Sequence, residues 1–333
     1  MNASDAGFDN PPADSPLSGR RGRSGASRSG GAPRSVEDWI RETARRLTAA
    51  EVCCSSGMQE PYLEAEYLVL HTFAIPLHTP ANRRPPPPGD AAQRMRGMLD
   101  KRIRQRQPAA YVTKEAFFAG AVYYVDERVL IPRSRIENMI DDPKGFSPWL
   151  DDGRVRRILD LGTGSGCLAI ALARRFPLAR VDAVDLSPDA LAVARVNRSR
   201  FKLQQRMRLI QSDLFAGLAG ERYDLIVSNP PYVPQADFER LPPEYRREPA
   251  LALRAGPDGL DLLEPILRQA PDFLTPGGLL VCETGDDVER ILMDRWPEAP
   301  VAWVPFHFGA SGVFAVLKEP LDAWRKDESG VHA

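Results

Sequence analysis

The sequence predicts an α/β fold in which a mostly parallel sheet follows a small helical domain and a β-hairpin. Three observations support this prediction: helical periodicity from Ser35 to about Gln107, β-rich segments over 108–133, and strands alternating with helices from about residue 154. Such alternation is typical of a parallel sheet covered by helices on both faces. The predicted divisions are a disordered tail (1–34), a helical domain (35–107), a hairpin linker (108–133), an α/β domain (134–320) and a flexible end (321–333).

Composition narrows the possible classes of protein. The 333 residues include 44 basic and 45 acidic side chains. Proteins that bind duplex nucleic acid usually carry a basic surplus, so the overall charge does not favour that class. The four cysteines form no Cys-x-x-Cys pair and the four histidines have no metal-ligand spacing, so reduced thiols and no metal are expected. The sequence has no apolar run of membrane-spanning length and no secretory signal pattern. We therefore expect a cytoplasmic protein that does not associate with a membrane.

The N-terminal third is predicted to be a tail followed by helices. Residues 1–34 are rich in Gly, Ser, Pro and Arg, and they contain too few large apolar residues to offset the entropy of ordering. Ser35 is predicted to begin the first helix, and Pro85–Pro88 should be a stiff connector. Apolar residues recur at helical spacing at Trp39, Ile40, Ala44 and Leu47, at Tyr62, Ala65 and Leu68, and at Met95, Met98, Leu99 and Ile103.

The hairpin and the sheet are predicted from short β-rich runs. The hairpin candidates are Tyr111-Val112, Phe117-Phe118, Val122–Val125 and Val129–Ile131, with turn points at Gly120 and Asp126. The sheet candidates are Ile158–Leu161, Val181–Val184, Met207–Ile210, Leu225–Val227 and Leu279–Cys282, with an antiparallel pair near Val301–Val304 and Val313–Leu317. Helices are expected over Cys167–Arg175 and Pro188–Asn197.

A glycine-rich loop, Asp160-Leu-Gly-Thr-Gly-Ser-Gly166, follows the first predicted strand of the sheet. Glycines allow a tight turn and the close approach of a ligand, and ligands of open parallel sheets bind at the carboxyl ends of strands. Taken alone, the loop is also compatible with an ordinary strand-to-helix turn. The third glycine, Gly166, comes one residue too early for the dinucleotide motif, and the absence of Gly-Lys-Ser/Thr excludes a P-loop.

Two acidic residues follow the next two strands. Asp185 lies about 20 positions beyond the loop, where a carboxylate typically accepts hydrogen bonds from ribose hydroxyls. Ser187 before Pro188 is the better helix cap, which leaves Asp185 for the ligand, while Asp182 is expected to face solvent. Asp213 and Leu214 follow the third strand, where they could contact an adenine. These three features in order favour a nucleoside-containing cofactor.

The fourth strand, Tyr223–Ser228, leads directly into Asn229-Pro230-Pro231-Tyr232. Two prolines fix an extended backbone and lack amide donors, so that the Asn229 side-chain oxygen and the Pro230 carbonyl can accept from one –NH2 group. Tyr232 offers a flat face for stacking. An amide nitrogen is a poor nucleophile, and two acceptors would hold it in line and favour charge separation. Asn229, Pro230, Pro231 and Tyr232 are therefore predicted to be catalytic in methylating a planar nitrogen, whose proton leaves during or after transfer.

These motifs resemble those of the class I S-adenosylmethionine (AdoMet)-dependent methyltransferases with an Asn-Pro-Pro-Tyr signature. That group includes amino-methylating DNA and RNA enzymes and protein-glutamine methyltransferases, and the order of helical domain, hairpin and catalytic domain resembles the protein-glutamine branch. Within that branch, several segments resemble the enzymes that modify ribosomal protein L-three, over roughly residues 36–320. They are Glu64–Thr72, Val125–Ser134, Asn229–Val233, Leu241–Tyr245, Glu248-Pro249 and Gly256–Leu260.

The chain also departs from this branch at three places. Pro132-Arg133-Ser134 matches it, whereas the release-factor branch usually has Pro-Arg-Pro. Arg135, however, stands where proline is expected, and Gly162 stands where cysteine is common. Glu283-Thr284-Gly285 replaces the more usual Glu-Val-Gly, and none of these departures is expected to touch the chemistry.

The resemblance implies a Rossmann-like class I methyltransferase domain with a seven-stranded, mostly parallel sheet, and AdoMet as cofactor. The residues implied for cofactor binding are Gly162, Thr163, Gly164, Ser165, Gly166, Asp185, Asp213, Leu214 and Asn229. The helical domain and the hairpin would recognise the protein substrate, and the expected reaction methylates a glutamine amide of large-subunit ribosomal protein L-three. Alternatives are glutamine methylation of peptide chain release factors, exocyclic-amine methylation of a nucleic acid, and a non-catalytic escort of a ribosomal protein.

Overall fold

The computed structural model describes residues 33–54, 58, 60–306 and 312–328, so most of the predicted N-terminal tail lies outside the described residues. The chain forms two compact units. The helical unit contains the chain up to Lys114 together with Pro242–Arg247, and the α/β unit contains Glu115–Leu241 and the chain from Glu248 onward. The segment 242–247 thus leaves the α/β unit and returns to it within six residues.

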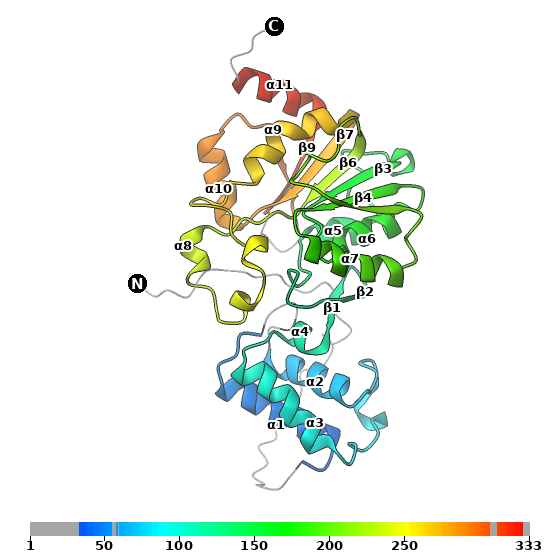
Figure 1. Ribbon diagram of the computed structural model, residues 1–333, viewed down its shortest axis with the longest axis vertical. Helices are drawn as coiled ribbons and strands as arrows, with labels where there is room; N and C mark the ends of the chain where they lie inside the picture. The colour runs from blue at the N-terminus through cyan, green and yellow to red at the C-terminus, as the bar shows by residue number, and fades with distance from the viewer. Residues whose placement is uncertain (1–32, 55–57, 59, 307–311, 329–333) are drawn as a thin grey trace. The chain divides into compact units, whose positions relative to one another are not determined.

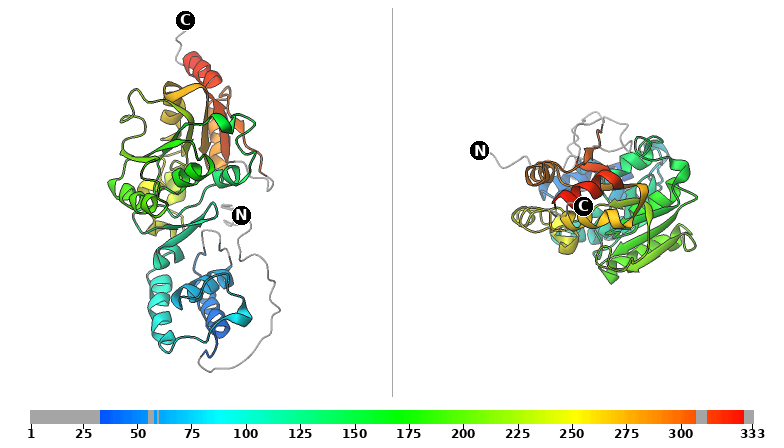
Figure 2. Two further views of the ribbon diagram at one scale, coloured as in Figure 1. Left: turned by 90° about the vertical axis from the view of Figure 1, so that its right-hand side faces the viewer. Right: turned by 90° about the horizontal axis from the view of Figure 1, so that it is seen from above.

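Three longer helices share the core of the helical unit (Figure 2). Its helices are α1 (Val36–Ala49), α2 (Pro61–Thr72), α3 (Ala91–Leu99) and α4 (Ala109–Thr113), with a 3-10 turn at Ala81–Arg83 and a π-helical turn at Asp100–Arg104. A capping box begins α1, because the Ser35 hydroxyl accepts from the Asp38 amide at 3.1 Å and the Asp38 carboxylate accepts from the Ser35 amide at 3.0 Å. This confirms the predicted helix start.

A buried ion-pair network holds the segment 242–247 in the helical unit. Arg102 is completely buried, and its guanidinium contacts Glu64 at 2.5 Å and Glu244 at 3.3 Å. Arg106 adds a contact to the same Glu244 oxygen at 3.1 Å. Buried charges are stable only when they are paired and hydrogen-bonded, so Glu244 fixes this segment, which ends in the 3-10 turn Tyr245–Arg247.

The α/β unit begins with a hairpin of β1 (Glu115–Phe118) and β2 (Ala121–Tyr124) and continues into a seven-stranded sheet. Its strands are β3 (Arg157–Leu161), β4 (Arg180–Asp185), β5 (Met207–Gln211), β6 (Tyr223–Ser228), β7 (Leu274–Glu283), β8 (Ala302–Trp303) and β9 (Val313–Leu317). The order is β5-β4-β3-β6-β7-β9-β8, with β9 antiparallel to both of its neighbours and all other pairs parallel. This topology confirms the predicted fold class.

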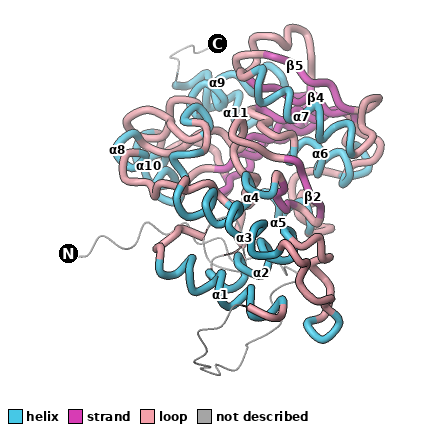
Figure 3. Tube along the Cα trace, turned by 60° about the horizontal axis from the view of Figure 1, so that its bottom comes forward, coloured by secondary structure: helices cyan, strands magenta, loops and turns pink. Residues whose placement is uncertain are grey.

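Helices cover both faces of the sheet (Figure 1). One apolar cluster joins α5 and α6 to one face, and a second joins α9, α10 and α11 to the other. Figure 3 shows α7 beside α6 and β4. The helices of this unit are α5 (Ile136–Asp141), α6 (Cys167–Arg175), α7 (Pro188–Arg200), α8 (Gln235–Phe238), α9 (Leu263–Phe273), α10 (Asp286–Arg295) and α11 (Lys318–Glu328), with 3-10 turns at Asp152–Arg154 and Ala250–Ala252.

Three local predictions differ from the structure. Tyr111-Val112 lies in α4 and Val129–Ile131 forms no strand, because the hairpin pairs Glu115–Phe118 with Ala121–Tyr124 and includes neither segment. The C-terminal end forms α11 as far as Glu328, in place of the predicted flexible end, because Leu321 and Trp324 are buried against the second apolar cluster.

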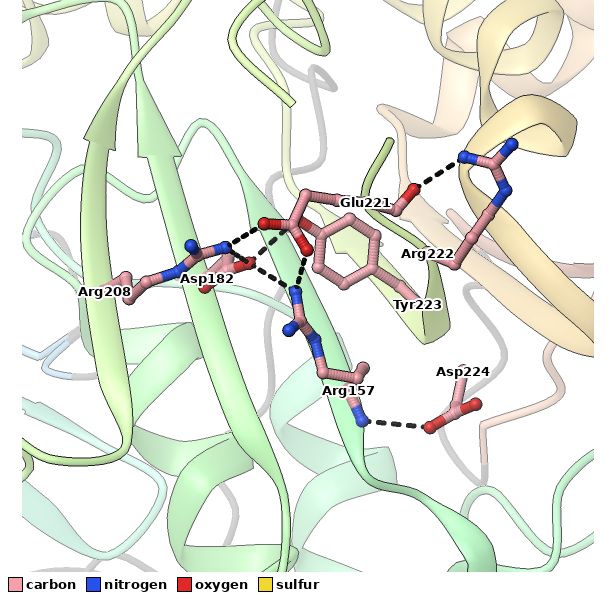
Figure 4. Close-up of polar contacts among 7 residues, drawn as sticks. All are labelled: Arg157, Asp182, Arg208, Glu221, Arg222, Tyr223 and Asp224. Atoms are coloured by element: carbon pink, nitrogen blue, oxygen red, sulfur yellow. Dashed lines mark hydrogen bonds and ion pairs between the residues drawn. The ribbon is translucent and has the colours of Figure 1, made fainter. Parts of the chain in front are cut away.

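Asp182 is buried, contrary to the prediction that it faces solvent, and it is the centre of a polar cluster towards the amino ends of the strands (Figure 4). Its carboxylate accepts from Arg208 Nε at 2.6 Å, Arg157 Nη2 at 3.0 Å and the Tyr223 hydroxyl at 2.9 Å. Glu221 accepts from the same two arginines, at 2.5 Å and 2.7 Å. The pattern of alternating residues in β4 does not show that neighbouring strands supply these partners.

Among the helices of the described ranges, none has both the length and the apolar character required to cross a bilayer. Within the same ranges, no group of three or more His, Cys, Asp or Glu side chains is arranged to hold a metal ion.

Candidate active site

The predicted site residues lie along one edge of the sheet. Residues 162–166 follow β3, Asp185 ends β4, Asp213 follows β5 and Asn229 follows β6, and these four strands are adjacent and parallel. Loop hydrogen bonds join them, from the Thr163 amide to the Val184 carbonyl at 2.8 Å and from the Ser212 amide to the Asp185 carbonyl at 3.1 Å. Segments that are far apart in the sequence therefore meet at the carboxyl ends of four strands.

The glycine loop turns through left-handed backbone conformations and faces open space. Gly162, Gly164 and Gly166 have φ values of +71°, +54° and +80°, which residues with a Cβ adopt rarely. A Cβ at Gly162 or Gly164 would meet no atom within 4 Å, whereas one at Gly166 would lie 3.2 Å from the Ala194 Cβ. The first two glycines thus line an open approach to the loop, and Gly166 allows close packing against α7.

Two carboxylates, the buried Asp160 and the half-buried Asp185, bind the backbone and side chains of this loop. Asp160 Oδ2 accepts from the Thr163 hydroxyl at 2.6 Å and the Ala169 amide at 3.1 Å, and burial raises the pKa of Asp160 to about 7. Asp185 accepts from the Gly164 amide at 2.8 Å and the Ser187 amide at 2.9 Å, and burial raises its pKa as well. Asp185 therefore ties the loop to β4, although Ser187 caps α7 as predicted. Each Asp185 oxygen retains acceptor capacity, since a carboxylate can accept about four hydrogen bonds.

The segment after β5 has a strained backbone at one predicted contact residue. Leu214 has a φ of +43°, and the Ser212 hydroxyl donates to its carbonyl at 3.0 Å while accepting from the Gly217 amide at 2.7 Å. Leu214 is half-buried, whereas Asp213 is exposed. Left-handed conformations of large residues are unfavourable, and they cluster at ligand-binding sites. Ser212, which sequence reasoning passed over, organises this turn.

Asn229 is oriented by a hydrogen bond to a distant segment. Its Nδ2 donates to the Arg133 carbonyl at 3.1 Å. The reverse orientation would bring two acceptor oxygens together, so Oδ1 is directed away from the Arg133 carbonyl. Asn229 and Pro231 are half-buried and Pro230 is buried. The neighbouring Ser228 hydroxyl donates to the Leu161 carbonyl at 2.9 Å, which ties the motif to the strand that precedes the glycine loop.

Tyr232 is held between two glycines that leave no room for side chains. A Cβ at Gly259 would lie 2.6 Å from the Tyr232 carbonyl oxygen, and one at Gly285 would lie 3.2 Å from the Tyr232 ring. The following residue, Val233, pairs with the segment around Arg254. Gly285 therefore packs against the motif. The residue of this segment that departs from the usual Glu-Val-Gly pattern is the buried Thr284, and the expectation that this departure leaves the chemistry untouched stays a prediction.

Two buried acids near the motif were not predicted to be site residues. Glu283, at the end of β7, accepts from the Ser134 hydroxyl and from the Arg135 amide, the latter at 3.0 Å. Burial raises the pKa of Glu283 to about 7. Glu248 accepts from the Ile131 amide at 2.8 Å and from Arg133 Nη1 at 2.8 Å and 3.0 Å. Their roles depend on partners more than 100 residues away, which local sequence patterns do not indicate.

The residues at this edge fit a nucleoside-containing cofactor. The open side of Gly162 and Gly164 leaves space against the loop, and the half-buried Asp185 carboxylate has acceptor capacity for two ribose hydroxyls. The strained Leu214 and the exposed Asp213 stand at the next strand end. The side chains and the open glycine cradle thus suit AdoMet.

Known proteins resemble this chain over most of its length. A family model described as the methyltransferase small domain matches residues 146–241. The chain is 45% identical over 282 residues to the ribosomal protein uL3 glutamine methyltransferase of Xanthomonas campestris pv. campestris, covering 84% of this chain and 90% of the relative. It is also 45% identical to the protein of that name from Xylella fastidiosa, covering 84% of this chain and 89% of the relative.

Solved structures show more distant similarity. A methyltransferase from Pyrococcus furiosus is 19% identical and covers 68% of this chain and 98% of its own, with a TM-score of 0.41. The two relatives show the family more directly, because nearly half of the residues are identical over most of both chains. An arrangement of glycine loop, strand-end acids and Asn-Pro-Pro-Tyr at one sheet edge agrees with that similarity. The chain belongs to the family of AdoMet-dependent ribosomal protein uL3 glutamine methyltransferases.

Proposed function

We propose that this protein methylates the side-chain amide nitrogen of a glutamine in ribosomal protein uL3, the protein called L-three above. The observation that carries the proposal is the 45% identity to two proteins of that name over 84% of the chain. The oriented Asn229 amide supports it, since an acceptor aimed outward at a strand end suits an –NH2 group. Because the substrate is a ribosomal protein, we place the reaction in the cytoplasm.

We infer that the cofactor is held by the glycine loop and the strand-end residues. The Asp185 carboxylate accepts from the Gly164 amide, so it lies beside the part of the loop at which Gly162 and Gly164 are open. Asp213 and Leu214 would contact the adenine, and Asn229 would border the reactive end. AdoMet supplies an electrophilic methyl group on a positively charged sulfur, which leaves with the electron pair of the broken C–S bond.

The Asn-Pro-Pro-Tyr residues would orient and polarise the glutamine amide. Asn229 Oδ1 and the Pro230 carbonyl would each accept one hydrogen of the –NH2 group, and the Tyr232 ring would lie against the planar amide. The nitrogen lone pair forms the new N–C bond, and the nitrogen then loses one proton. None of the four motif side chains is a strong base, so the proton passes to water. Positioning and preorganised dipoles supply the rate enhancement.

The test incubates the full-length protein with methyl-labelled AdoMet and purified uL3, release factors or ribosomal RNA. We expect label on uL3 alone, and mass spectrometry should place it on one glutamine side chain. Asn229→Ala should abolish labelling, while Gln205→Ala, an exposed amide between α7 and β5, should preserve it. Label on release factors or RNA with none on uL3 would contradict the proposal. Labelling of uL3 that survives Asn229→Ala would contradict the role given to the motif.

A further inference from the structure

A short segment without regular secondary structure, Ile131–Arg135, is held from three sides. Glu248 binds the Ile131 amide and the Arg133 guanidinium, and Asn229 donates to the Arg133 carbonyl. Glu283 accepts from Ser134 and from the Arg135 amide. Three side chains separated by up to 54 positions (229 to 283) therefore converge on five consecutive residues. The segment directly precedes α5, whose Ile136 is completely buried.

Glu248 is the strongest of these three anchors. Its side chain is 1% exposed, and one of its oxygens lies 2.8 Å from the Ile131 amide while both lie within 3.0 Å of Arg133 Nη1. Hydrogen bonds between ionised partners are about twice as strong as neutral ones. A buried carboxylate with this geometry holds both the start of the segment and the side chain of its third residue. It therefore restricts the position of the intervening Arg133 backbone.

The position of the Arg133 carbonyl decides which atom of Asn229 is presented outward. At 3.1 Å it accepts from Asn229 Nδ2, and this single bond distinguishes the nitrogen from the oxygen of the side-chain amide. If the carbonyl moved away, the Asn229 amide could rotate and present Nδ2, a donor, to a substrate –NH2 group that also donates. The orientation of the acceptor thus depends on a backbone atom that Glu248 restrains.

We propose that Glu248 is a positioning residue for methyl transfer, acting through the Arg133 backbone on the orientation of Asn229. This inference rests on the proposed function, in which Asn229 Oδ1 accepts from the glutamine amide. Glu248 does not touch the reacting atoms. Its loss is therefore expected to reduce turnover while the glycine loop and Asp185, which have separate supports, continue to bind the cofactor.

The kinetic test compares Glu248→Ala and Glu248→Gln in the full-length protein. Because misplacement of a catalytic group by about 1 Å can cost about 100-fold in rate, we expect kcat on uL3 to fall by up to about 100-fold in Glu248→Ala. Glu248→Gln keeps an acceptor for the Ile131 amide and should fall less. The AdoMet dissociation constant and the KM for uL3 should change by no more than about twofold, a split that general destabilisation would not produce.

The matched control is Asp182→Asn, which alters another buried, arginine-paired carboxylate of the same unit. Asp182 is 2% exposed and has no contact with the Asn-Pro-Pro-Tyr residues among its hydrogen bonds. We expect this variant to lower the melting temperature and to leave kcat within about twofold at a temperature where it is folded. Equal losses of kcat in Asp182→Asn and Glu248→Ala would overturn the proposal.

A second readout requires no methyl acceptor. The side-chain –NH2 signals of Asn229, identified in nitrogen-15 spectra by their absence in Asn229→Asp, should change shift and lose protection from water exchange in Glu248→Ala and Glu248→Gln. They should be unchanged in Asp182→Asn. Unchanged Asn229 signals in both Glu248 variants would overturn the positioning role, even if the wild type methylates uL3. If the wild type methylates no glutamine, the proposed function fails, and these signals still decide the role of Glu248.

Discussion

Carboxylates at the two ends of the parallel sheet have different hydrogen-bond partners. Towards the amino ends, Asp182 accepts from two arginines and a tyrosine (Figure 4). At the carboxyl ends, Asp160, Asp185 and Glu283 accept mainly from backbone amides and hydroxyls, and burial raises the pKa of all three. The amino end is a closed ionic cluster that stabilises the fold. At the carboxyl end, Asp160 and Asp185 accept no hydrogen bond from an arginine or lysine side chain of the described residues, and the glycine loop that they bind faces open space. That end of the sheet is therefore suited to receive a charged ligand.

The largest effect should come from Asn229→Ala at the carboxyl end. Loss of one preorganised polar group at a reacting centre typically costs about 10²–10³-fold in kcat. We expect a loss of that size in uL3 methylation, measured with labelled AdoMet, and a melting temperature close to that of the wild type. A loss below tenfold would mean that the amide orientation set by Arg133 has little part in the reaction.

The next largest effect should come from Asp182→Asn at the amino end, and it should appear in stability. Loss of a hydrogen bond to a charged group costs about 1.5–3 kcal/mol, and the arginines that pair with Asp182 keep access to water because their side chains are 33% and 55% exposed. Arg157 and Arg208 are the charges affected here. Denaturant titration should show this loss, while AdoMet affinity measured by calorimetry should be unchanged. Weakened AdoMet binding with unchanged stability would reverse the comparison between the two ends.

Asp185→Asn should weaken AdoMet binding by about 10- to 100-fold, since hydrogen bonds to charged groups contribute about 1.5–3 kcal/mol. Asparagine keeps one acceptor oxygen, so the loop contact to the Gly164 amide is partly retained. Calorimetry with AdoMet measures the change. Asp189→Asn, an exposed acid in the first turn of α7, is the matched control and should bind as the wild type does. An equal loss in both variants would remove the evidence for a ribose contact.

The smallest effect should be a change in how stability depends on pH. The pKa of Glu283 is raised from 4.5 to about 7, so the folded state holds a proton that the unfolded state has released between these values. Its contribution to stability is complete below about pH 4.5 and is lost as the pH rises through about 7. Glu283→Gln should therefore lose less stability than the wild type between pH 5 and pH 7.5.

Denaturant titrations at several pH values provide this measurement. Part of the wild-type dependence should persist in Glu283→Gln, because the pKa of Asp160 is also raised to about 7. The exposed Glu298→Gln is the control, and its profile should follow that of the wild type. A Glu283→Gln profile as steep as that of the wild type would show that the Glu283 carboxylate is already ionised at pH 5.

Much of the α/β unit could be predicted because its elements are set by local chemistry. The helix Cys167–Arg175 has the predicted bounds, and Ser187 with Pro188 begins α7 as predicted. The short apolar runs gave the strands of the sheet, and the edge pair of β8 and β9 is antiparallel as expected. The predicted site residues also meet at one sheet edge, since parallel neighbours place their carboxyl ends together.

Other features could not be predicted because their causes lie far away in the sequence. Tyr111 and Val112 have β-forming side chains but lie in α4, and Asp182 looks like a solvent-facing strand residue until Arg157, Arg208 and Tyr223 surround it. Tertiary partners override local propensity in both cases. Similarly, α11 depends on the burial of Leu321 and Trp324 against other elements of the α/β unit.

By itself, the sequence determined the order of strands and helices, the glycine loop, the strand-end acids and the Asn-Pro-Pro-Tyr motif, because short-range periodicity and backbone restrictions specify them. Only the tertiary structure decided how that motif is aimed. The Asn229 amide is oriented by the Arg133 carbonyl, and Glu248 restrains Arg133 from a position 115 residues further along the chain. A hydrogen bond selects its partner by distance and direction in space, and these exist only once the chain has folded.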